Sequence, residues 1–313
     1  MYHFIVNLNS KSNTSRRLWQ LLELELKRRG VKYKSHFTQY AGHASDIAAQ
    51  LCAAHDQNGV SAPLVIVTAG GDGTANEVLN GIPVSACKKV ILGFLPIGSG
   101  NDLAAALGIP SDPFEALNHI LSLRRTVCID HGVLYCPESG HTRHFHVSSG
   151  VGYDADICLE ASTTPVKTFL NQLRLGRLIY LIIALKQVFK HKPLRAKLVF
   201  DGLTSQSGSY LFITAMNAAM EGGGMRLAPH AKINDHRLSV CIVRDFPRIK
   251  ILILLPALFF GLHTKFSGID VIDCSCVDIF CKEPATLHAD GEFSGKEKHV
   301  RYSCAKEQIR VML

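Results

Sequence analysis

The sequence has no hydrophobic run long enough to cross a membrane. Its longest apolar stretch, Ile251 to Leu262, is interrupted by Pro256 and falls well short of the roughly 20 residues that a spanning helix needs. The chain also starts directly with a strand-like segment, Tyr2 to Asn7, without the basic segment and apolar core of a secretory signal. These absences predict a cytoplasmic protein that is not integral to a membrane.

Cysteines in paired metal-binding spacing are also missing. The densest group, Cys274 and Cys276 with Cys281 nearby, contains no C-x-x-C pair and lies in a strand-like run. His144 and His146 share one face of an expected strand, but two ligands do not complete a metal site, so we expect surface histidines. The ten cysteines are therefore expected to be thiols in a reducing compartment.

Acidic residues are outnumbered by basic ones. The counts of 34 Lys and Arg against 26 Asp and Glu give a net charge of +8. This excess suits an anionic partner, whether nucleic acid, nucleotide phosphate or an acidic membrane, and charge alone does not choose among them. With 47% hydrophobic and 19% charged residues in 313, the chain is long and apolar enough for two folded domains.

The first third of the chain alternates strand-like and helix-like segments. Thr14 or Ser15 is placed to cap the first helix. Alternation with short connections predicts a parallel, doubly wound α/β sheet, in which ligands bind at the carboxyl ends of the strands. The expected strands are Phe4–Leu8, Val31–Phe37, Leu64–Thr68 and Val90–Leu95.

After about Thr126 the pattern changes to short alternating runs between Gly, Asp and Ser turns, which predicts a mainly antiparallel β domain. The expected strands include His144–Ser149, Lys197–Asp201, Tyr210–Asn217, Leu238–Val243 and Val277–Cys281. Helix-like segments near Val166–Lys192 and Arg248–Leu262 interrupt it. The first of these is apolar nearly all round and punctuated by basic residues, so it is either buried or faces a membrane. The expected domains are 1–126 with a returning segment 300–313, and 127–299.

A glycine-rich turn between a strand and a helix carries the strongest chemical signal. The run Leu64–Thr68 leads into Gly70-Gly71-Asp72-Gly73-Thr74. Glycines let the backbone approach phosphate, and the helix that follows presents free N–H groups and the positive end of its dipole. Asp72 can bind a magnesium–phosphate complex. Neither the G-x-x-x-x-G-K-[ST] motif nor the dinucleotide fingerprint is present here.

A second glycine turn at the end of a strand repeats this layout. The run Val90–Leu95 leads into Gly98-Ser99-Gly100-Asn101-Asp102, which we expect to face the same crevice as the first turn, although Asn101 and Asp102 could simply cap the next helix. Far along the chain, Asp290-Gly291-Glu292 places two carboxylates beside a glycine. On its residues alone this segment is an exposed hairpin tip.

The ordered set of GGDGT, P-x-G-x-x-N-D and D-G-E resembles the bacterial diacylglycerol kinase and lipid kinase family. The resemblance covers essentially the whole chain, including Leu198–Gly202 and Ala228–Lys232. It implies a Rossmann-like nucleotide domain and a β-sandwich domain of the NAD-kinase and diacylglycerol-kinase type. It also implies transfer of the γ-phosphoryl group of ATP, with Mg²⁺, to a lipid hydroxyl, with diacylglycerol as the favoured acceptor.

The same resemblance assigns site residues by position. Asp72, Asp290 and Glu292 are the catalytic set, with Glu292 favoured as proton acceptor, and Lys232, Asp235 and Arg237 are the magnesium set. The sequence departs from the family at Ser10, Asn13 and His236, where the family has Pro, Gly and Gly. The nucleotide-binding set is Asn9, Ser10, Lys11, Ser12, Asn13, Thr38, Gly71, Asp72, Gly73, Thr74, Ala75, Asn76, Glu77, Ser99, Asn101 and Asp102.

Two alternatives stay open at this point. An NAD kinase would share the GGDG turn, and a non-catalytic regulator could keep the fold and bind nucleotide or lipid without turnover. Asp130 either organises metal-bound water or caps a strand end. We expect a lipid substrate, peripheral association with a membrane and no nucleic acid partner, and leave the assembly open between monomer and homodimer.

Overall fold

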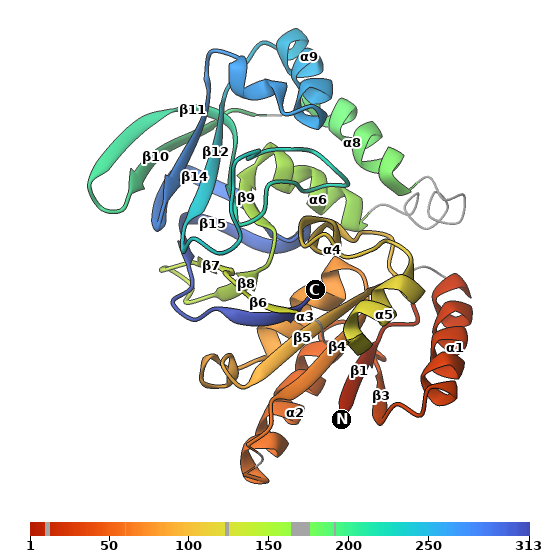
Figure 1. The fold of residues 1–313 in the computed structure, drawn as a ribbon. Helices are drawn as coiled ribbons and strands as arrows, with labels where there is room; N and C mark the ends of the chain where they lie inside the picture. Colours follow the sequence, from red (N-terminus) through yellow and green to blue (C-terminus); the bar gives the residue numbers. More distant parts are fainter. Residues whose placement is uncertain (10–12, 60, 123–124, 164–175, 191) are drawn as a thin grey trace. The chain divides into compact units, whose positions relative to one another are not determined.

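The computed structural model describes residues 1–9, 13–59, 61–122, 125–163, 176–190 and 192–313 (Figure 1). The chain folds into two compact units, Met1–Ile129 with Glu307–Leu313, and Asp130–Lys306. The last long strand, β15, runs through Glu292–Cys304 in the second unit, so the segment that returns to the first unit begins at Glu307.

The first unit is built on a six-stranded sheet in the order β3-β1-β4-β5-β16-β6. Neighbouring strands are parallel from β3 to β16, and only β6 runs antiparallel to its partner β16. The predicted parallel α/β sheet is therefore confirmed. The strands are β1 (Tyr2–Val6), β3 (Tyr33–Phe37), β4 (Leu64–Gly70), β5 (Val90–Pro96), β6 (Thr126–Ile129) and β16 (Ile309–Met312).

Helices cover this sheet through apolar stripes. Trp19, Leu22 and Leu26 of α1 pack with Leu117 of α5 against Phe4 and its neighbours on the strands. Ile5 points to the opposite face, because side chains alternate along a strand, and it is fully buried too. The helices are α1 (Asn13–Arg28), α2 (His43–Gln57), α3 (Asp72–Gly81), the short η1 (Val84–Ala86), α4 (Asp102–Ala106) and α5 (Pro113–Ser122).

The expected cap of α1 is wrong. The helix already begins at Asn13, so Thr14 and Ser15 lie inside its first turn. Ser15 is fully buried, and its hydroxyl donates to the carbonyl oxygen of Ile97, 3.0 Å away. Ser15 therefore fixes α1 to the chain that follows β5.

The second unit is a mainly antiparallel β structure, as predicted. Its sheet has the order β13-β12-β11-β10-β14-β15-β7-β8, and β9 pairs with both β11 and β14, so the pairing closes on itself. The strands are β7 (Gly132–Tyr135), β8 (Thr142–Phe145), β9 (Ser148–Gly152), β10 (Leu194–Phe200), β11 (Thr204–Met216), β12 (Leu238–Arg244), β13 (Ile269–Cys274), β14 (Cys276–Ala289) and β15 (Glu292–Cys304).

The helices of the second unit are α6 (Tyr153–Thr163), α8 (Gly176–Lys190), α9 (Arg248–Phe259) and the short η2 (Leu262–Lys265). The expected helix over 166–192 is described only from Gly176, as α8. In the ranges that the structure describes, no helix is both long and apolar enough to cross a membrane. All ten cysteines are free thiols, as expected.

One expected strand is interrupted. The run from His144 to Ser149 was assigned to a single strand, but β8 ends at Phe145 and β9 begins at Ser148. His146, expected at the surface, is buried at 1% exposure. The strand is interrupted because the Asp290 carboxylate binds the backbone N–H groups of this connection.

Candidate functional site

The two glycine turns of the first unit lie against each other. Because β4 pairs in parallel with β5 and Gly70 is opposite Pro96, the chain leaves both strands at the same edge. Gly98 N–H donates to the carbonyl of Gly70 over 3.0 Å, and Asp72 N–H donates to that of Gly100 over 3.1 Å. A Cβ on Gly98 would lie 2.3 Å from the Cα of Gly71. Only glycine therefore fits at Gly98.

Asp72 joins the two turns. Its carboxylate accepts the backbone N–H groups of Asp102 at 2.9 Å and Leu103 at 3.1 Å, and so caps α4 from another loop. The sequence did not predict this structural role. Each carboxylate oxygen can accept more than one bond, so the expected binding of magnesium–phosphate by Asp72 stays a prediction.

The end of β1 reaches the same place through Asn7, which the sequence analysis missed. Its amide donates to the hydroxyl of Thr74 at 3.1 Å, and its carbonyl oxygen accepts the N–H of Asn9 at 3.0 Å. Thr38 N–H donates to the carbonyl of Val6 at the same strand end. A polar residue directly after a buried strand was the available signal for Asn7.

The remaining nucleotide-set residues differ in accessibility. Ser99 and Asn9 are exposed, whereas Ala75 and Asn76 are buried. Glu77 accepts the N–H of Ala44 at the start of α2. The amide of Asn101 donates to the carbonyl of Gly98 at 3.1 Å and so stabilises its own turn.

The first nucleotide loop, Asn9 to Asn13, departs from the family at Ser10 and Asn13. Ser10, Lys11 and Ser12 lie outside the described residues, and Asn13 is described only as the first residue of α1. The expected phosphate contacts of this loop therefore stay predictions.

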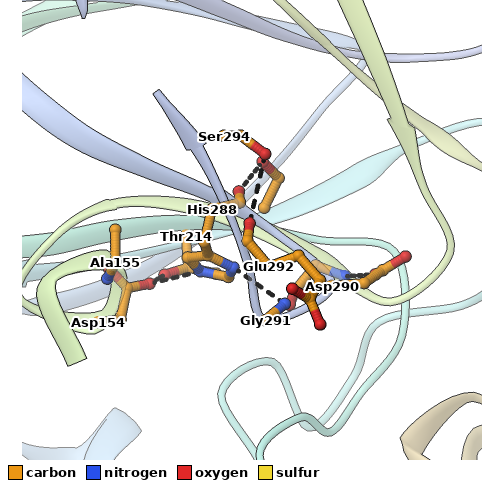
Figure 2. Close-up of polar contacts among 10 residues, drawn as sticks. Asp154, Ala155, Thr214, His288, Asp290, Gly291, Glu292 and Ser294 are labelled. Carbon is orange, nitrogen blue, oxygen red and sulfur yellow. Dashed lines mark hydrogen bonds and ion pairs between the residues drawn. The ribbon is translucent and has the colours of Figure 1, made fainter. Parts of the chain in front are cut away.

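The acidic turn of the second unit is a tight hairpin between β14 and β15. Ala289 pairs with Glu292, which leaves Asp290 and Gly291 as a two-residue loop. Both have positive φ, 48° and 77°, the signature of the type I′ turn that Asp-Gly favours. The Asp290–Gly291 segment is thus a hairpin tip, as its residues alone predicted (Figure 2).

The two carboxylates at this tip have different surroundings. Asp290 accepts the N–H groups of His146 and Val147, each at 2.8 Å, and of Ser148 at 3.1 Å. It therefore binds the connection between β8 and β9 and explains the break there. Glu292 is exposed, and its carboxylate makes no hydrogen bond or ion pair with the described residues. Of the pair, Glu292 is the carboxylate open to a substrate.

A buried histidine lies directly behind the hairpin. His288 is 2% exposed, and its Nε2 lies 3.1 Å from a carboxylate oxygen of Asp154. Its Nδ1 accepts the N–H of Gly291 at 3.4 Å, a contact drawn in Figure 2. Burial lowers the pKa of His288, but the carboxylates of Asp154, Glu221 and Asp290 outweigh it and raise the pKa above its ordinary value.

The expected magnesium residues share one loop, which Asp130 holds. The fully buried Asp130 accepts the N–H of His236 at 2.7 Å and lies 3.3 Å from its ring Nδ1. His236 has a φ of 59°, a left-handed conformation that glycine adopts most easily. Glycine is the residue that the diacylglycerol kinase family usually has where this chain has His236. In this structure Asp130 anchors a loop.

The donor chemistry of that loop suits magnesium. The set combines a carboxylate, Asp235, with the backbone carbonyls of Lys232 and Arg237, and oxygen ligands are those that Mg²⁺ prefers. Asp235 accepts the N–H of Arg237 at 3.1 Å with one oxygen, and the Arg237 guanidinium donates to the carbonyl of Asp273 at 2.9 Å. The loop is thus held in a fixed conformation, and metal binding by it stays a prediction.

Models of known protein families match both units of the chain. A family model described as the diacylglycerol kinase catalytic domain matches residues 1–133. A second model, described as the YegS C-terminal NAD kinase beta sandwich-like domain, matches residues 148–313. A Klebsiella pneumoniae protein named "Probable lipid kinase YegS-like" is 33% identical over 74% of this chain and 72% of its own length. A Mycobacterium tuberculosis protein named diacylglycerol kinase is 29% identical over 86% of this chain and 81% of its own length.

Solved structures share the fold at lower identity. Two crystal structures from Bacillus anthracis each align over 99% of this chain, with TM-scores of 0.73 and 0.68 at 19% and 17% identity. The second of these is described as a diacylglycerol kinase. An NAD kinase from Archaeoglobus fulgidus in complex with ATP aligns over the whole chain with a TM-score of 0.51 at 13% identity.

Proposed function

Because the chain belongs to the diacylglycerol kinase catalytic-domain family, with a YegS-type C-terminal domain, we propose that it transfers the γ-phosphoryl group of ATP to diacylglycerol, giving phosphatidic acid. The relatives are named lipid kinases or diacylglycerol kinases. The proposal adds the identity of the lipid that accepts the phosphoryl group. The observation that carries the ATP part of the proposal is the pair of interlocked glycine turns, Gly70–Thr74 and Gly98–Asp102, at one edge of a parallel sheet. The choice of diacylglycerol is supported by the relatives named diacylglycerol kinase.

These turns supply groups that can bind the phosphates of a nucleoside triphosphate. The helix α3 starts directly at the first turn, so the positive end of its dipole is available to anionic oxygens. The first N–H groups of α4 are already bound by the Asp72 carboxylate. Ser99 is exposed at the second turn and adds a hydroxyl. In phosphoryl transfer the protein chiefly positions the reactants and stabilises charge, and a rigid double turn suits that task.

Magnesium, when bound, would neutralise charge on the phosphate oxygens. Asp72, whose carboxylate joins the two turns, would be the residue that holds it. The loop with Lys232, Asp235 and Arg237 offers a separate, structural site. These assignments rest on donor chemistry and on the family resemblance.

Glu292 is proposed as the proton acceptor for the lipid hydroxyl. It is exposed and follows a rigid two-residue turn, whereas Asp290 is committed to three backbone N–H groups. A base must come within about 3 Å of the proton that it accepts, directly or through one water. Asp290 then serves to fix the turn that presents Glu292.

We further propose that α8 and α9 dock the protein on an anionic lipid surface in the cytoplasm. Ile182, Leu185 and Phe189 form one stripe of α8 and are 55%, 40% and 62% exposed. The neighbouring α9 (Figure 1) exposes Ile249 and Ile253, at 68% and 56%. Large apolar side chains in two adjacent rows are unusual on a surface that only water covers.

Basic side chains accompany these stripes. Lys190 on α8, Arg248 on α9 and Lys265 on η2 are exposed, whereas Lys186 on α8 is paired with Glu160. Each cation near an anionic membrane is worth about 1 kcal/mol, and apolar residues inserted at the interface add to this. This combination favours an interfacial role over the purely buried helix that the sequence left open.

The acceptor is identified by transfer of labelled γ-phosphate from ATP. Diacylglycerol, a sphingoid base, phosphatidylglycerol and undecaprenol would be offered in mixed micelles, with NAD in buffer as the non-lipid alternative. We expect labelled phosphatidic acid as the main product. Labelling of another lipid would correct the substrate, labelling of NAD would replace a lipid kinase by an NAD kinase, and no labelling would favour a non-catalytic regulator.

A further inference from the structure

Three polar side chains from separate elements meet behind the acidic hairpin. His288 comes from the end of β14, Asp154 from the start of α6 and Thr214 from β11. Asp154 is the centre: one of its oxygens accepts the Thr214 hydroxyl and lies 3.1 Å from Nε2 of His288. Figure 2 shows this row leading from Asp154 through His288 to Gly291.

Gly150 on β9 leaves room for the row. A Cβ on this residue would lie 2.2 Å from the Asp154 carboxylate, 2.7 Å from Nε2 of His288 and 2.7 Å from the Thr214 hydroxyl. All three polar groups therefore converge on the space that this glycine keeps open. The row depends on the β9–β14 pairing, which places Gly150 opposite His288.

The hydrogen bonds fix the tautomer of the histidine. Gly291 N–H is a donor, so in the neutral ring Nδ1 of His288 carries the lone pair and the proton is on Nε2. Nε2–H then donates to Asp154. A carboxylate that orients a histidine by binding one ring nitrogen leaves the other nitrogen with a defined role.

We propose that His288, oriented by Asp154, is a positioning residue that fixes the backbone at Gly291 and thereby aims Glu292. The inference rests on the proposed function, in which Glu292 accepts the proton of the lipid hydroxyl. His288 is 2% exposed, so it acts on the reaction only through the turn.

Protonation of His288 has opposite effects on stability and on transfer. The groups that face the ring are Asp154 from α6, Glu221 from the loop after β11 and Asp290 from the turn, and these carboxylates raise its pKa although burial lowers it. Because the folded-state pKa is raised, the stabilisation is complete below the unfolded pKa and is lost as pH rises through the folded pKa. A proton on Nδ1, however, removes the acceptor for Gly291 N–H. Acidification should therefore stabilise the fold but lower kcat.

Two amide substitutions separate the two ring nitrogens. In His288→Asn the amide oxygen can replace Nδ1 as acceptor for Gly291 N–H, whereas in His288→Gln the amide can replace Nε2 as donor to Asp154. We expect the Asn variant to keep most of the wild-type kcat. The Gln variant should lose roughly 10-fold or more, the scale on which a misplaced group slows a reaction. The KM for ATP should not change in either variant, and both should lose the acidic decline of kcat.

Asp154→Asn provides a second, independent variant. It keeps an acceptor for Nε2–H but removes the charge, so the pKa of His288 should fall and the acidic midpoint of kcat should move to lower pH. Denaturation curves show whether each variant folds. Equal kcat in the Asn and Gln variants, or an unchanged midpoint in Asp154→Asn, would overturn the proposal.

A structural readout keeps this test separate from the proposed function. Long-range proton–nitrogen NMR spectra of the wild-type protein report which nitrogen of His288 carries the proton, and amide exchange reports the protection of Gly291. We expect the Nε2–H tautomer and a Gly291 amide that exchanges faster in His288→Gln. The Nδ1–H tautomer contradicts the positioning role. The expected NMR result in a protein that labels no lipid would leave the row intact and reject the lipid kinase.

Discussion

At the scale of single residues, Asp72 and Asp290 share a structural task. Each sits in a tight turn and accepts backbone N–H groups from a segment far along the chain, 30 residues away for Asp102 and 144 for His146. Carboxylates that accept several N–H groups hold loops firmly, because hydrogen bonds to a charged acceptor are stronger than neutral ones. The resemblance gave these aspartates catalytic roles, and the structure adds loop anchoring to them.

Replacing Asp72 should affect both stability and activity. Asp72→Ala leaves the N–H groups of Asp102 and Leu103 without their acceptor, so we expect a loss of about 1–3 kcal/mol in the free energy of unfolding. Phosphoryl transfer should fall below detection because both glycine turns lose their fixed geometry. Urea denaturation and labelled-phosphate transfer measure the two effects.

Asp112→Ala is the matched control for Asp72→Ala. Asp112 caps α5 by accepting the N–H groups of Phe114 and Glu115, both at 2.9 Å, and it belongs to neither glycine turn. We expect a loss of about 0.5–2 kcal/mol with transfer unchanged. If both variants keep wild-type transfer, Asp72 has no part in the site.

What the sequence could show at this scale was the identity of the chemical groups. Local patterns singled out the turns that carry Asp72, Ser99 and Asp102, and the family resemblance singled out Asp290 and Glu292; the roles of all five in the site stay predictions. Their partners could not be found, because a contact such as Asp290 with the N–H of Val147 depends on the pairing of β9 with β14, which no local pattern specifies. His288 and Asp154 were missed for the same reason.

At the scale of elements, the contact between the two glycine turns is the feature most sensitive to change. Gly98→Ala would place a Cβ 2.5 Å from the N of Gly71 as well as close to its Cα. Backbone atoms cannot move aside cheaply, so we expect a destabilisation of about 1–3 kcal/mol, as for overpacking in a core, and a large loss of ATP affinity. Equilibrium ATP binding and urea denaturation check this.

Gly100→Ala is the milder comparison for Gly98→Ala. Its Cβ would meet only the Asp72 carboxylate, at 3.0 Å, and a side chain can give way more easily than a backbone. We expect a smaller loss of stability than in Gly98→Ala. A Gly98→Ala protein with wild-type stability and ATP affinity would mean that the turns do not pack as described.

The apolar stripes of α8 and α9 make a second prediction at this scale. Phe189 is 62% and Phe260, just after α9, 73% exposed. Burying such a side chain in an interface contributes about 1.5–3 kcal/mol, so Phe189→Ser with Phe260→Ser should lower partitioning onto phosphatidylglycerol vesicles at least ~10-fold. Raising the salt concentration should weaken wild-type binding further, because it screens the basic residues.

Leu203→Ser is the control for the vesicle experiment. Leu203 is 88% exposed, but it lies in the turn between β10 and β11 and belongs to neither α8 nor α9. Its replacement should leave vesicle binding unchanged. Equal loss in the Leu203 and phenylalanine variants, or equal binding to neutral and anionic vesicles, contradicts docking through α8 and α9.

The elements themselves were largely predictable. Alternating runs correctly located β10, β11 and β12, and buried runs located β4 and β5, because burial on one or two faces imposes its own pattern on a strand. The exception, the break between β8 and β9, is imposed by Asp290 from outside the segment. The cap of α1 was misplaced because the helix already includes Asn13, which places Thr14 and Ser15 inside its first turn.

At the scale of the whole molecule, thiol chemistry tests the distribution of burial. Burial raises the pKa of Cys52 and Cys136 to about 11 and that of Cys274 and Cys281 to about 12, so these thiols should react slowly. Cys128 is the exposed cysteine. We expect it to react first with a disulfide reagent, and all ten thiols to react after unfolding.

The control for the thiol measurement is Cys128→Ser. The fast phase should disappear in this variant, while the number of thiols that react in denaturant falls by one. A fast phase that persists would mean that another cysteine, either a buried one or one of the partly exposed Cys158, Cys276 and Cys304, reacts as readily as Cys128.

The central claim is that Glu292, presented by a hairpin that Asp290 holds, accepts the proton when a lipid hydroxyl is phosphorylated. Its most direct test is the steady-state transfer of labelled phosphate from ATP to diacylglycerol by wild type, Glu292→Gln and Asp290→Asn, with ATP affinity and unfolding free energy measured alongside. We expect Glu292→Gln to keep wild-type stability and ATP affinity but to lose about 10²-fold or more in kcat, the scale of general-base loss. Asp290→Asn should lose stability as well. A Glu292→Gln protein that phosphorylates diacylglycerol at the wild-type rate would contradict the account.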